Sequence, residues 1–402
     1  MTAALPALVL RRRQDRRLRT GHPWVFSNEV DTARTPLTQF RPGDWVNLST
    51  QGGRLLGTAY VNPNTLIAAR LVSRKPDRPL DRACIKERVE RALSLRDRLY
   101  ARPYYRLVYA ESDGLPGLVI DRHGEVLVAQ TGTQGMERLR GDIAAAVNEC
   151  LEPRSLVFRN DAPARTIEGL AQYVETVIGD PPGSIQIDEN GARFEIDPLG
   201  GQKSGWFYDH RDNRARLARY VRDARVLDVF SYAGGFGIQA ALAGAAAVVC
   251  VDSSAAACEL AIRNAELNDL SDRIRVCRDD AFEVLKSFLA GGEHFDVVVL
   301  DPPAFARRRK DVKAAQEAYT RLNRYAMQVL NSGGILASAS CSSHVDAERF
   351  QEALRTAARA AGRELQILER GHQAPDHPVH PALPESDYLK FVIGRVVMNR
   401  DW

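Results

Sequence analysis

The sequence predicts an α/β protein whose C-terminal part is a doubly wound open sheet, preceded by a β-rich N-terminal part and a small central α+β part. From residue 224 onward, short apolar runs alternate with amphipathic helical stretches, which is typical of a parallel sheet covered by helices. The first 75 residues contain only short strand-like segments separated by turns. The chain of 402 residues is also too long for one ordinary domain.

The N-terminal part, residues 1–75, is predicted to form a small β-barrel. Its strand candidates are apolar or alternating segments, and the breaks between them contain Gly, Pro or Asn, which favour turns. The segments are ALVLRRR, WVFSNEV, DWVNLST, LLGTAYV and LIAARLV, and the breaks are GHP, RPGD, QGG and NPN. The stretch KPDRPLDR at 75–82 is typical of a linker.

The central part, residues 83–198, is predicted to be α+β. Residues 83–100 place apolar side chains at helical spacing, and Arg96 interrupts the apolar face. A second helix is expected near 136–150. Strands are expected in RLVYAES, GLVIDRHG, VLVAQTG, SLVFRN and SIQIDENGARFEIDP.

The C-terminal part, residues 199–402, is predicted to carry the parallel sheet. Strands are expected in ARVLDVF, AVVCVD, RIRVC, FDVVVLD and GILASAS, and helices at 237–244, 254–268, 280–289, 312–331 and 345–361. Ligands of such sheets bind outside the carboxyl ends of the strands. The functional residues are therefore expected where these strands end.

The charge is distributed unevenly along the chain. Apolar residues make up 45% and charged residues 26%, as in a globular protein, and the net charge is +4. Residues 1–80 alone carry 13 Arg or Lys against five Asp or Glu, so the remainder is negative. Clustered cations indicate a polyanion such as RNA as partner, although an ordinary solvated surface has the same composition.

Membrane and metal partners are not expected. The apolar stretch 241–251 is shorter than the roughly 20 residues that span a bilayer, and the N-terminus lacks a signal-peptide pattern, so we expect a cytoplasmic protein. The six cysteines lack the spacing of a zinc site or a disulfide framework. His344, His372, His377 and His380 invite a metal hypothesis, but no carboxylate or cysteine completes a ligand set.

Four acidic strand ends indicate a nucleotide-like ligand. Asp228 ends the first strand and is followed by a Gly-rich turn, whose backbone can pass close to a ligand. Asp252 ends the second strand, where it can accept hydrogen bonds from ribose hydroxyls. Asp280 follows the third strand, placed to meet an adenine, and Asp301 follows the fourth. An NAD site shares part of this pattern, but the turn lacks G-x-G-x-x-G, so the phosphate-free S-adenosylmethionine is the better match.

Four motifs together resemble those of a known family: GQKSGWFYDHRDNR (201–214), DVFSYAGGFG (228–237), LDPPAFARRRK (300–310) and SASCSSH (338–344). They are similar to motifs of the bacterial PUA-domain class I methyltransferases that form 5-methylcytosine in 23S rRNA. GHPWVFSNEV and GHQAPDHPVHPALPESDYLK fit the same group, so the resemblance covers nearly the whole chain. It implies an N-terminal PUA RNA-binding domain, a central α+β domain and a C-terminal class I methyltransferase (Rossmann-like) domain that binds S-adenosylmethionine and acts on 23S rRNA.

The resemblance extends the expected cofactor site to the segment before the first strand. Lys203, Phe207 and Asp209 would close over the cofactor, although each would also suit an ordinary aromatic-anchored turn. The other residues expected to bind the cofactor follow the strands: Asp228, Phe230, Ser231, Tyr232, Gly234, Gly235, Gly237, Asp252, Ser253, Asp280, Ala281 and Asp301.

Cys341 and Asp301 are the expected catalytic residues. Carbon 5 of cytosine is a poor nucleophile, so its methylation requires a nucleophile to add first to carbon 6. In the resembled family the cysteine matching Cys341 has this role, whereas without that resemblance a buried structural thiol is the commoner use. Asp301 would hydrogen-bond the base edge near N3, cap the next helix, or do both. No residue is assigned to remove the proton from carbon 5.

Two basic runs are candidate RNA contacts, and either could also be a solvated surface. The expected substrate-binding residues are Arg11, Arg12, Arg13, Pro302, Pro303, Arg307, Arg308, Arg309 and Lys310. The prolines would stiffen a loop that supports a flipped base.

Two other functions stay open. An enzyme that methylates an exocyclic amine of guanine or adenine would also use a D-P-P-x-F motif and would need no thiol. A non-catalytic RNA-binding scaffold would keep the fold without methyl transfer. A homodimer is also compatible with the sequence, which contains no recognisable interface.

Overall fold

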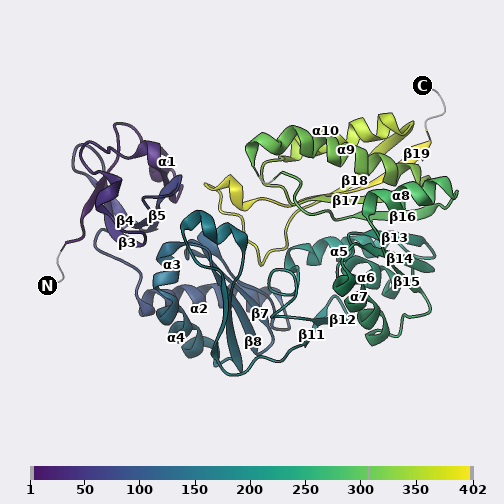
Figure 1. Cartoon of the computed structure of the whole chain (residues 1–402), viewed down its shortest axis with the longest axis horizontal. Helices are drawn as coiled ribbons and strands as arrows, with labels where there is room; N and C mark the ends of the chain where they lie inside the picture. The colour runs from purple at the N-terminus through teal and green to yellow at the C-terminus, as the bar shows by residue number, and fades with distance from the viewer. Residues whose placement is uncertain (1–3, 307, 399–402) are drawn as a thin grey trace. The chain divides into compact units, whose positions relative to one another are not determined.

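The computed structural model describes residues 4–306 and 308–398 (Figure 1). The chain divides into two compact units. Unit 1 contains the described residues up to 185, with 197–206 and 375–386. Unit 2 contains residues 186–196 and 207–374 and the described residues from 387 onward. In the described part of the chain, no helix combines the length and apolarity needed to span a membrane.

In the N-terminal sheet of unit 1, the segments next to the two edge strands are joined by backbone hydrogen bonds, as in a small barrel. Its strand order is β1-β3-β4-β5-β2, with helix α1 between β1 and β2. The bounds are β1 Ala7–Val9, α1 Arg16–Arg19, β2 Trp24–Phe26, β3 Asp44–Ser49, β4 Leu55–Val61 and β5 Ile67–Ser73. At the open edges, the backbone N–H of Arg11 donates to the Glu29 carbonyl, and that of Asp31 donates to the Val9 carbonyl, both at 2.8 Å. These bonds connect the segments flanking the two edge strands.

The second part of unit 1 has an α+β arrangement, although most of the stretch SIQIDENGARFEIDP, whose strands were expected here, belongs to unit 2. Its sheet has the order β10-β9-β8-β7-β6, in which only β8 and β9 run parallel. The strands are β6 Tyr104–Tyr109, β7 Leu118–His123, β8 Val126–Thr131, β9 Ser155–Asn160 and β10 Tyr173–Ile178. The helices are α2 Arg82–Leu99, α3 Gln134–Arg138 and α4 Arg140–Leu151. The helix expected near 136–150 is therefore two helices, and α2 and α4 share an apolar core with the sheet.

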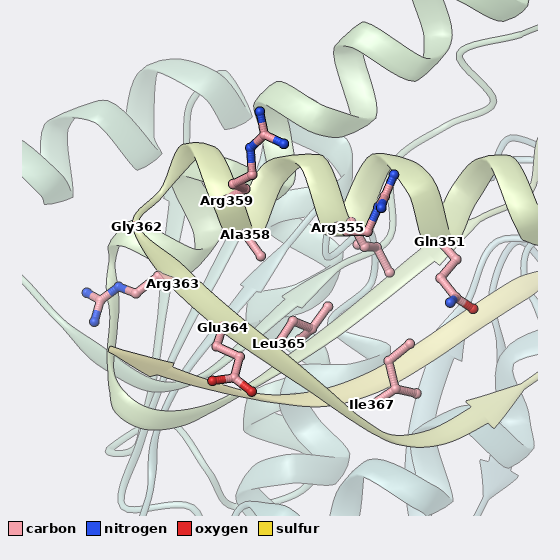
Figure 2. Close-up of a pocket in the computed structure, with 10 residues that line it drawn as sticks. Gln351, Arg355, Ala358, Arg359, Gly362, Arg363, Glu364, Leu365 and Ile367 are labelled. Atoms are coloured by element: carbon pink, nitrogen blue, oxygen red, sulfur yellow. The ribbon is translucent and has the colours of Figure 1, made fainter. Parts of the chain in front are cut away.

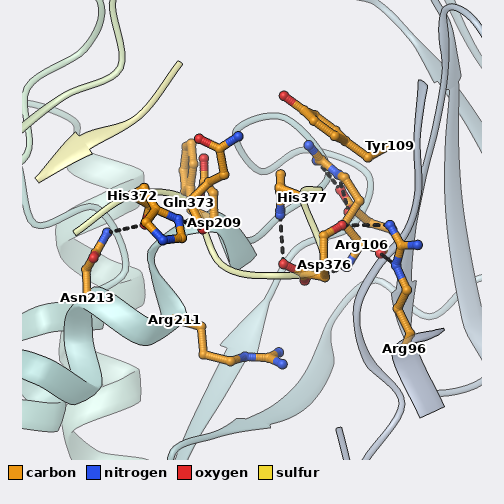
Figure 3. A network of polar contacts seen from close by, with 12 residues as sticks. Arg96, Arg106, Tyr109, Asp209, Arg211, Asn213, His372, Gln373, Asp376 and His377 are labelled. Carbon is orange, nitrogen blue, oxygen red and sulfur yellow. Dashed lines mark hydrogen bonds and ion pairs between the residues drawn. The ribbon is translucent and has the colours of Figure 1, made fainter. Parts of the chain in front are cut away.

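Arg96 is fully buried, which explains how a cation occupies the apolar face of α2. Its guanidinium makes two 2.7 Å hydrogen bonds to the Asp113 carboxylate and one of 2.8 Å to the Asp376 carbonyl (Figure 3). The Asp376 carboxylate in turn accepts the Arg106 backbone N–H at 2.9 Å and lies 2.8 Å from Nδ1 of His377. Buried polar contacts thus fasten the C-terminal segment of unit 1 to its central sheet.

Unit 2 contains a seven-stranded sheet with the order β15-β14-β13-β16-β17-β19-β18. Its strands are β13 Arg225–Val229, β14 Ala247–Asp252, β15 Ile274–Arg278, β16 Phe295–Leu300, β17 Leu330–Ser340, β18 Arg363–Gly371 and β19 Lys390–Met398. The five predicted strands, β13 to β17, are parallel. Strands β18 and β19 extend the sheet in the antiparallel sense, so the sheet is mixed. The hairpin of β11 Ile185–Glu189 and β12 Ala192–Ile196 precedes it.

Unit 2 has one helix that was not predicted, α5, and its other helices begin and end close to their predicted limits. They are α5 Arg211–Leu217, α6 Gly235–Leu242, α7 Ala255–Leu267, α8 Ala281–Ala290, α9 Val312–Gln328 and α10 Ala347–Ala360. Helices α8, α9 and α10 share one apolar core with the sheet. Helices α6 and α7 pack against β14 and β12 (Figure 1). This arrangement is the doubly wound fold that the strand–helix alternation predicts.

The buried pair of Arg96 and Asp113 generates the first prediction. Asp113→Ala leaves a buried guanidinium without its carboxylate, so we expect it to lower the free energy of unfolding by about 3–5 kcal/mol. Replacing both residues by apolar ones (Arg96→Met with Asp113→Leu) should recover most of this loss. Urea denaturation followed by circular dichroism measures both effects.

The matched control is Glu352→Ala, which removes the partner of Arg355 at the exposed face of α10. Because solvent screens that pair, the unfolding midpoint should hardly change. A change for Asp113→Ala as small as that for Glu352→Ala would contradict a stabilising role for the buried pair.

Candidate active site

The parallel sheet of unit 2 brings four predicted residues to one edge. Asp228 lies in β13 and Asp252 ends β14, while Asp301 follows β16 and Cys341 follows β17. Strand β13 pairs with β14 on one side and β16 on the other, and β16 pairs with β17. Because all four strands run in the same direction, their carboxyl ends meet at this edge, where ligands of such sheets bind.

Asp228 is buried in full. Its Oδ2 accepts the backbone N–H of Gly237 at 2.8 Å, and its Oδ1 has no hydrogen-bond partner in the described part of the chain. Burial raises the pKa of Asp228 to about 7, and the charges of Asp301 and Asp252 add to this increase. A buried carboxyl oxygen without a donor is a position where a ligand can supply one.

The turn after β13 carries backbone strain. Phe230 and Tyr232 have φ of 66° and 47°, in the left-handed region that side chains other than Gly seldom adopt. Such residues persist where the surrounding structure enforces them, often at ligand sites. Gly234, with φ of 80°, precedes α6 without this penalty.

Gly235 and Gly237 also have a packing role. A Cβ on Gly237 would lie 2.5 Å from Sγ of Cys250, and one on Gly235 would lie 2.8 Å from Nε of Arg214. Helix α6 therefore approaches β14 closely at Gly237, and the Arg214 side chain of α5 closely at Gly235, because these positions lack side chains. Contact between these two glycines and a cofactor stays a prediction.

Asp252, at the end of β14, accepts hydrogen bonds from the turn that follows β13 and from its own strand end. Its Oδ2 accepts the backbone N–H of Tyr232 and its Oδ1 accepts that of Ser254, both at 2.9 Å. Nearby, Ser231 is buried and its Oγ has no hydrogen-bond partner among the described residues, whereas Ser253 is exposed. Two orphaned buried oxygens, on Ser231 and Asp228, fit a polar ligand rich in donors such as the adenosyl and amino groups of S-adenosylmethionine.

Asp280 has a structural role in addition to its predicted contact. Its Oδ1 accepts the backbone N–H groups of Phe282 and Glu283 at 2.9 and 3.2 Å, so it caps α8. Ala281 is the first residue of that helix and is buried. The adenine contact of both residues stays a prediction.

The segment before β13 is divided between the two units. Lys203 belongs to unit 1, whereas Phe207 and Asp209 belong to unit 2. The Phe207 ring lies edge-on to Tyr232, with centroids 5.5 Å apart, which places it beside the Gly-rich turn. Asp209 is buried, and its carboxylate accepts the hydroxyl of Tyr388. In unit 2, this segment therefore contacts both the turn and Tyr388, two residues before β19.

Asp301 does not cap a helix, so that interpretation of the sequence was wrong. The next α-helix, α9, begins only at Val312, directly after the 3₁₀ turn Arg309–Asp311. Instead, Oδ1 of Asp301 lies 3.2 Å from Nε2 of the buried His210. Asn213 donates its side-chain N–H to Nδ1 of His210 at 3.3 Å, while its own oxygen accepts from Arg216. The proton of His210 therefore sits on Nε2, from which it is donated to Asp301.

Cys341 directly follows Ser340, the last residue of β17. Its Sγ is 3.8 Å from the carbonyl oxygen of Pro302, in the loop that follows Asp301. The neighbouring Ser340 and Ser342 are buried, and their hydroxyls lie 2.9 and 3.0 Å from the Tyr319 hydroxyl on α9. The other five cysteines lie within helices or strands: Cys84, Cys150, Cys250, Cys258 and Cys277.

Three residues near this edge were missed by the sequence reasoning. His210 belongs to a quoted motif but was not singled out, although a buried histidine after two aromatics could have been noticed. Tyr319 looks like an ordinary apolar position of α9, and Lys390 like an ordinary strand residue. Their partners are far away in the sequence, so no local pattern marks them.

The predicted RNA contacts are distributed over both units. In unit 2, Arg308, Arg309, Lys310 and Pro303 are exposed, Pro302 is buried, and Arg307 lies outside the described residues. In unit 1, Arg11, Arg12 and Arg13 are exposed. RNA binding by these residues stays a prediction.

A surface groove of about 760 Å³ lies between α10 and β18, away from the strand ends (Figure 2). Arg355, Arg359 and Glu364 line it beside Leu365 and Ile367. None of the predicted site residues contributes to it, so the candidate active site is defined by the chemistry at the sheet edge rather than by this groove. In the described part of the chain, no group of three His, Cys, Asp or Glu side chains is arranged to hold a metal ion.

The fold and the strand-end site define an S-adenosylmethionine-dependent methyltransferase, and comparison with known proteins agrees. The model of the S-adenosylmethionine-dependent methyltransferase family matches residues 164–390, and that of the PUA-like domain matches residues 8–74. The chain belongs to this methyltransferase family, in the group that includes the proteins called ribosomal RNA large subunit methyltransferase I. It binds S-adenosylmethionine as its cofactor.

Relatives of that name match nearly end to end. The protein of Salmonella arizonae is 37% identical over 397 residues, covering 98% of both chains. Those of Tolumonas auensis and Vibrio cholerae are 39% identical and cover 96% of this chain and 98% of their own. A solved methyltransferase complexed with SAH, SMU.776, is 21% identical, with a TM-score of 0.85 over 97% of this chain and 100% of its own. This last similarity shows the shared fold.

The buried carboxyl of Asp228 generates a prediction about stability and pH. Its pKa is raised from 3.8 to about 7, so ionisation costs the folded state on the order of 4 kcal/mol. At pH values between the unfolded and the folded pKa, Asp228 keeps its proton in the folded protein but has lost it in the unfolded chain. This group therefore makes the free energy of unfolding fall as the pH rises through this range. Asp228→Asn keeps an acceptor for Gly237 and removes the cost. It should raise the melting temperature at about pH 8, by an amount that shrinks toward about pH 4.

Thermal unfolding at several pH values measures this effect. The control is Asp272→Asn, which alters an exposed carboxyl before β15 and should not change the pH dependence. If Asp228→Asn is no more stable than the wild type at high pH, then ionisation of the buried carboxyl does not destabilise the folded protein.

Proposed function

We propose that this protein transfers the methyl group of S-adenosylmethionine to carbon 5 of a cytosine in 23S rRNA, with Cys341 as the nucleophile. The observation that carries the proposal is the position of Cys341: it follows β17 directly, with Sγ 3.8 Å from the carbonyl of Pro302, next to Asp301. The rRNA substrate is supported by the relatives, which are called ribosomal RNA large subunit methyltransferases.

In the first step, the Cys341 thiolate adds to carbon 6 of the cytosine. The S–C6 bond forms, and the electron pair of the C5–C6 double bond shifts toward carbon 5 and N3. The Asp301 carboxylate accepts a hydrogen bond from the amino group at carbon 4, on the base edge near N3, and so holds the ring in position during this addition. His210 donates to one oxygen of Asp301, which orients the carboxylate and leaves the other oxygen for the base.

S-adenosylmethionine supplies an electrophilic methyl group bonded to a sulfonium. Carbon 5, made nucleophilic by the addition of Cys341, would form the new carbon–methyl bond while the bond between the methyl group and the sulfonium sulfur breaks, and S-adenosylhomocysteine would leave with that electron pair. A base then removes the proton from carbon 5, the C5–C6 double bond re-forms, and the S–C6 bond breaks with its electron pair returning to the thiolate. The base for this last step has no assigned residue.

The cofactor would be held by the residues at the ends of β13 and β14. Asp228 and Ser231 offer buried oxygens to its donors, and Asp252 offers a carboxylate to its ribose hydroxyls. Phe207 packs beside this turn and supplies an apolar surface.

The nucleophile generates the central prediction. Cys341→Ala should lower methylation at carbon 5 of cytosine by at least about 1000-fold, because the ring is not activated without the thiolate. The measurement is nucleoside mass spectrometry of unmodified 23S rRNA incubated with labelled S-adenosylmethionine. The control is Cys277→Ala, which changes a half-buried thiol of β15 and should retain activity.

Three results would contradict the proposal. Label in methylated guanosine or adenosine would favour an amine methyltransferase. Formation of 5-methylcytidine that is indifferent to Cys341 would remove the covalent mechanism. RNA binding without any label would favour a scaffold.

The basic loop before α9 generates a prediction about RNA binding. Arg308 and Arg309 are exposed next to the proposed base-binding loop, so their replacement by Ala together should remove about two phosphate contacts. The slope of log affinity against log salt concentration should become less steep by about 1.5–2. Filter binding to an rRNA fragment at several salt concentrations measures it.

The matched control replaces Arg355 and Arg359, two exposed arginines of α10 that line the separate groove. It removes the same charge from the same unit and should leave the slope unchanged. Equal effects of the two double variants would mean that only net charge matters, and the loop would lose its role in RNA binding.

A further inference from the structure

Lys390 is placed beside the nucleophile by the antiparallel end of the sheet. It is the first residue of β19 and pairs with Ser340, the last residue of β17, directly before Cys341. The pairing of these strands fixes the backbone of Lys390 beside the end of β17 that leads into Cys341. None of the roles described so far uses this side chain.

The ammonium group of Lys390 is turned toward backbone carbonyls and not toward a carboxylate. Its Nζ donates to the carbonyl of Ser342 at 2.6 Å and to that of Tyr388 at 2.7 Å. Within residues 4–306 and 308–398, no carboxylate lies within ion-pair distance of Nζ. A neutral amine has only two N–H groups, and these carbonyls satisfy both. The charged form has a third N–H to offer to another neighbour.

The neighbour to which we assign it is Cys341, which directly follows the residue that pairs with Lys390. Burial lowers the pKa of Lys390 to about 8, and among the negative charges that oppose this, the Cys341 thiolate acts most strongly, followed by Asp387 and Asp346. From α9, Tyr319 also faces Cys341, and burial raises the pKa of its hydroxyl, so it stays neutral. The attraction between an ammonium and a thiolate favours the charged form of both groups. A lysine poised between its two forms near neutral pH can accept a proton from a thiol.

We propose that Lys390 takes the thiol proton of Cys341 and holds the resulting thiolate as an ion pair, ready to attack the base. The S–H bond breaks, an N–H bond forms on Nζ, and sulfur keeps the electron pair, so no other reactant is needed. When the S–C6 bond breaks at the end of the reaction, the returning thiolate meets the same ammonium. This inference rests on the proposed function of Cys341, and Lys390 acts through that cysteine as a positioning residue.

The test measures how fast iodoacetamide alkylates Cys341 at different pH values in the full chain, without RNA, by peptide mass spectrometry. Alkylation follows the thiolate, so its midpoint reports the ionisation of Cys341. Lys390→Gln keeps a donor for the carbonyls but loses the charge. It should raise the midpoint by about one pH unit or more, and slow alkylation near neutral pH about tenfold. Lys390→Arg keeps the charge and should keep the low midpoint.

Lys286→Met is the matched control, since it removes an exposed lysine of α8 and should leave the midpoint unchanged. Alkylation of the fully buried Cys250 reports whether each variant is folded. If Lys390→Gln exposes Cys250, then Lys390→Met serves as the second neutral variant, and the shift must appear in a variant that protects Cys250.

Two outcomes would overturn the inference: an unchanged midpoint in a folded neutral variant, or an equal shift in Lys390→Arg, which would mean that packing and not charge matters. Failure of the proposed function looks different. If Lys390→Gln shifts the midpoint but Cys341→Ala still methylates fully, the ion pair exists but has no role in catalysis. An inactive Cys341→Ala protein with no midpoint shift would remove only the role of Lys390.

Discussion

The backbone pairing of β13 with β16 is the constraint on which the site depends. It sets Asp228 opposite Val299 and Val229 opposite Leu300, so that the chain reaches Asp301 just beyond the end of β13. The backbone N–H of Asp301 donates to the Val229 carbonyl at 3.3 Å and continues this ladder. A shift of one residue would turn Asp228 to the other face of the sheet. The two carboxyls stay neighbours at the ligand edge as long as this register is kept.

The antiparallel end of the sheet adds the polar network around Cys341. Pairing of β17 with β19 brings the residues around 390 next to those around 340, although they are far apart in the sequence. Tyr388 then reaches Asp209, and Lys390 reaches the carbonyl of Ser342. The parallel strands thus position the groups proposed to bind cofactor and base, and the added strands determine the surroundings of the thiol.

Periodicity and strand-end residues were enough to predict the parallel sheet and its acidic edge, because both are local in sequence. What could not be predicted depends on distant partners. Arg96 interrupts an apolar helical face, and only the fold reveals Asp113 and the carbonyl of Asp376 as its acceptors. The helix-capping interpretation of Asp301 followed from D-P-P, a common helix start. It was wrong because the chain continues for ten residues before α9, and His210 takes the place of a helix end as its partner.

The charges at this edge favour the two reactants by separate means. Asp252 and Asp301 give the strand ends a negative potential, which suits a cofactor that carries a sulfonium, whereas the buried Asp228 resists ionisation. The same potential opposes the thiolate proposed for Cys341, so carboxylates cannot supply the stabilisation that the proposed mechanism requires. A cation is needed, and it must not form an ion pair with the acids, or its charge would be neutralised. Lys390 meets this condition because backbone carbonyls, not carboxylates, receive its hydrogen bonds.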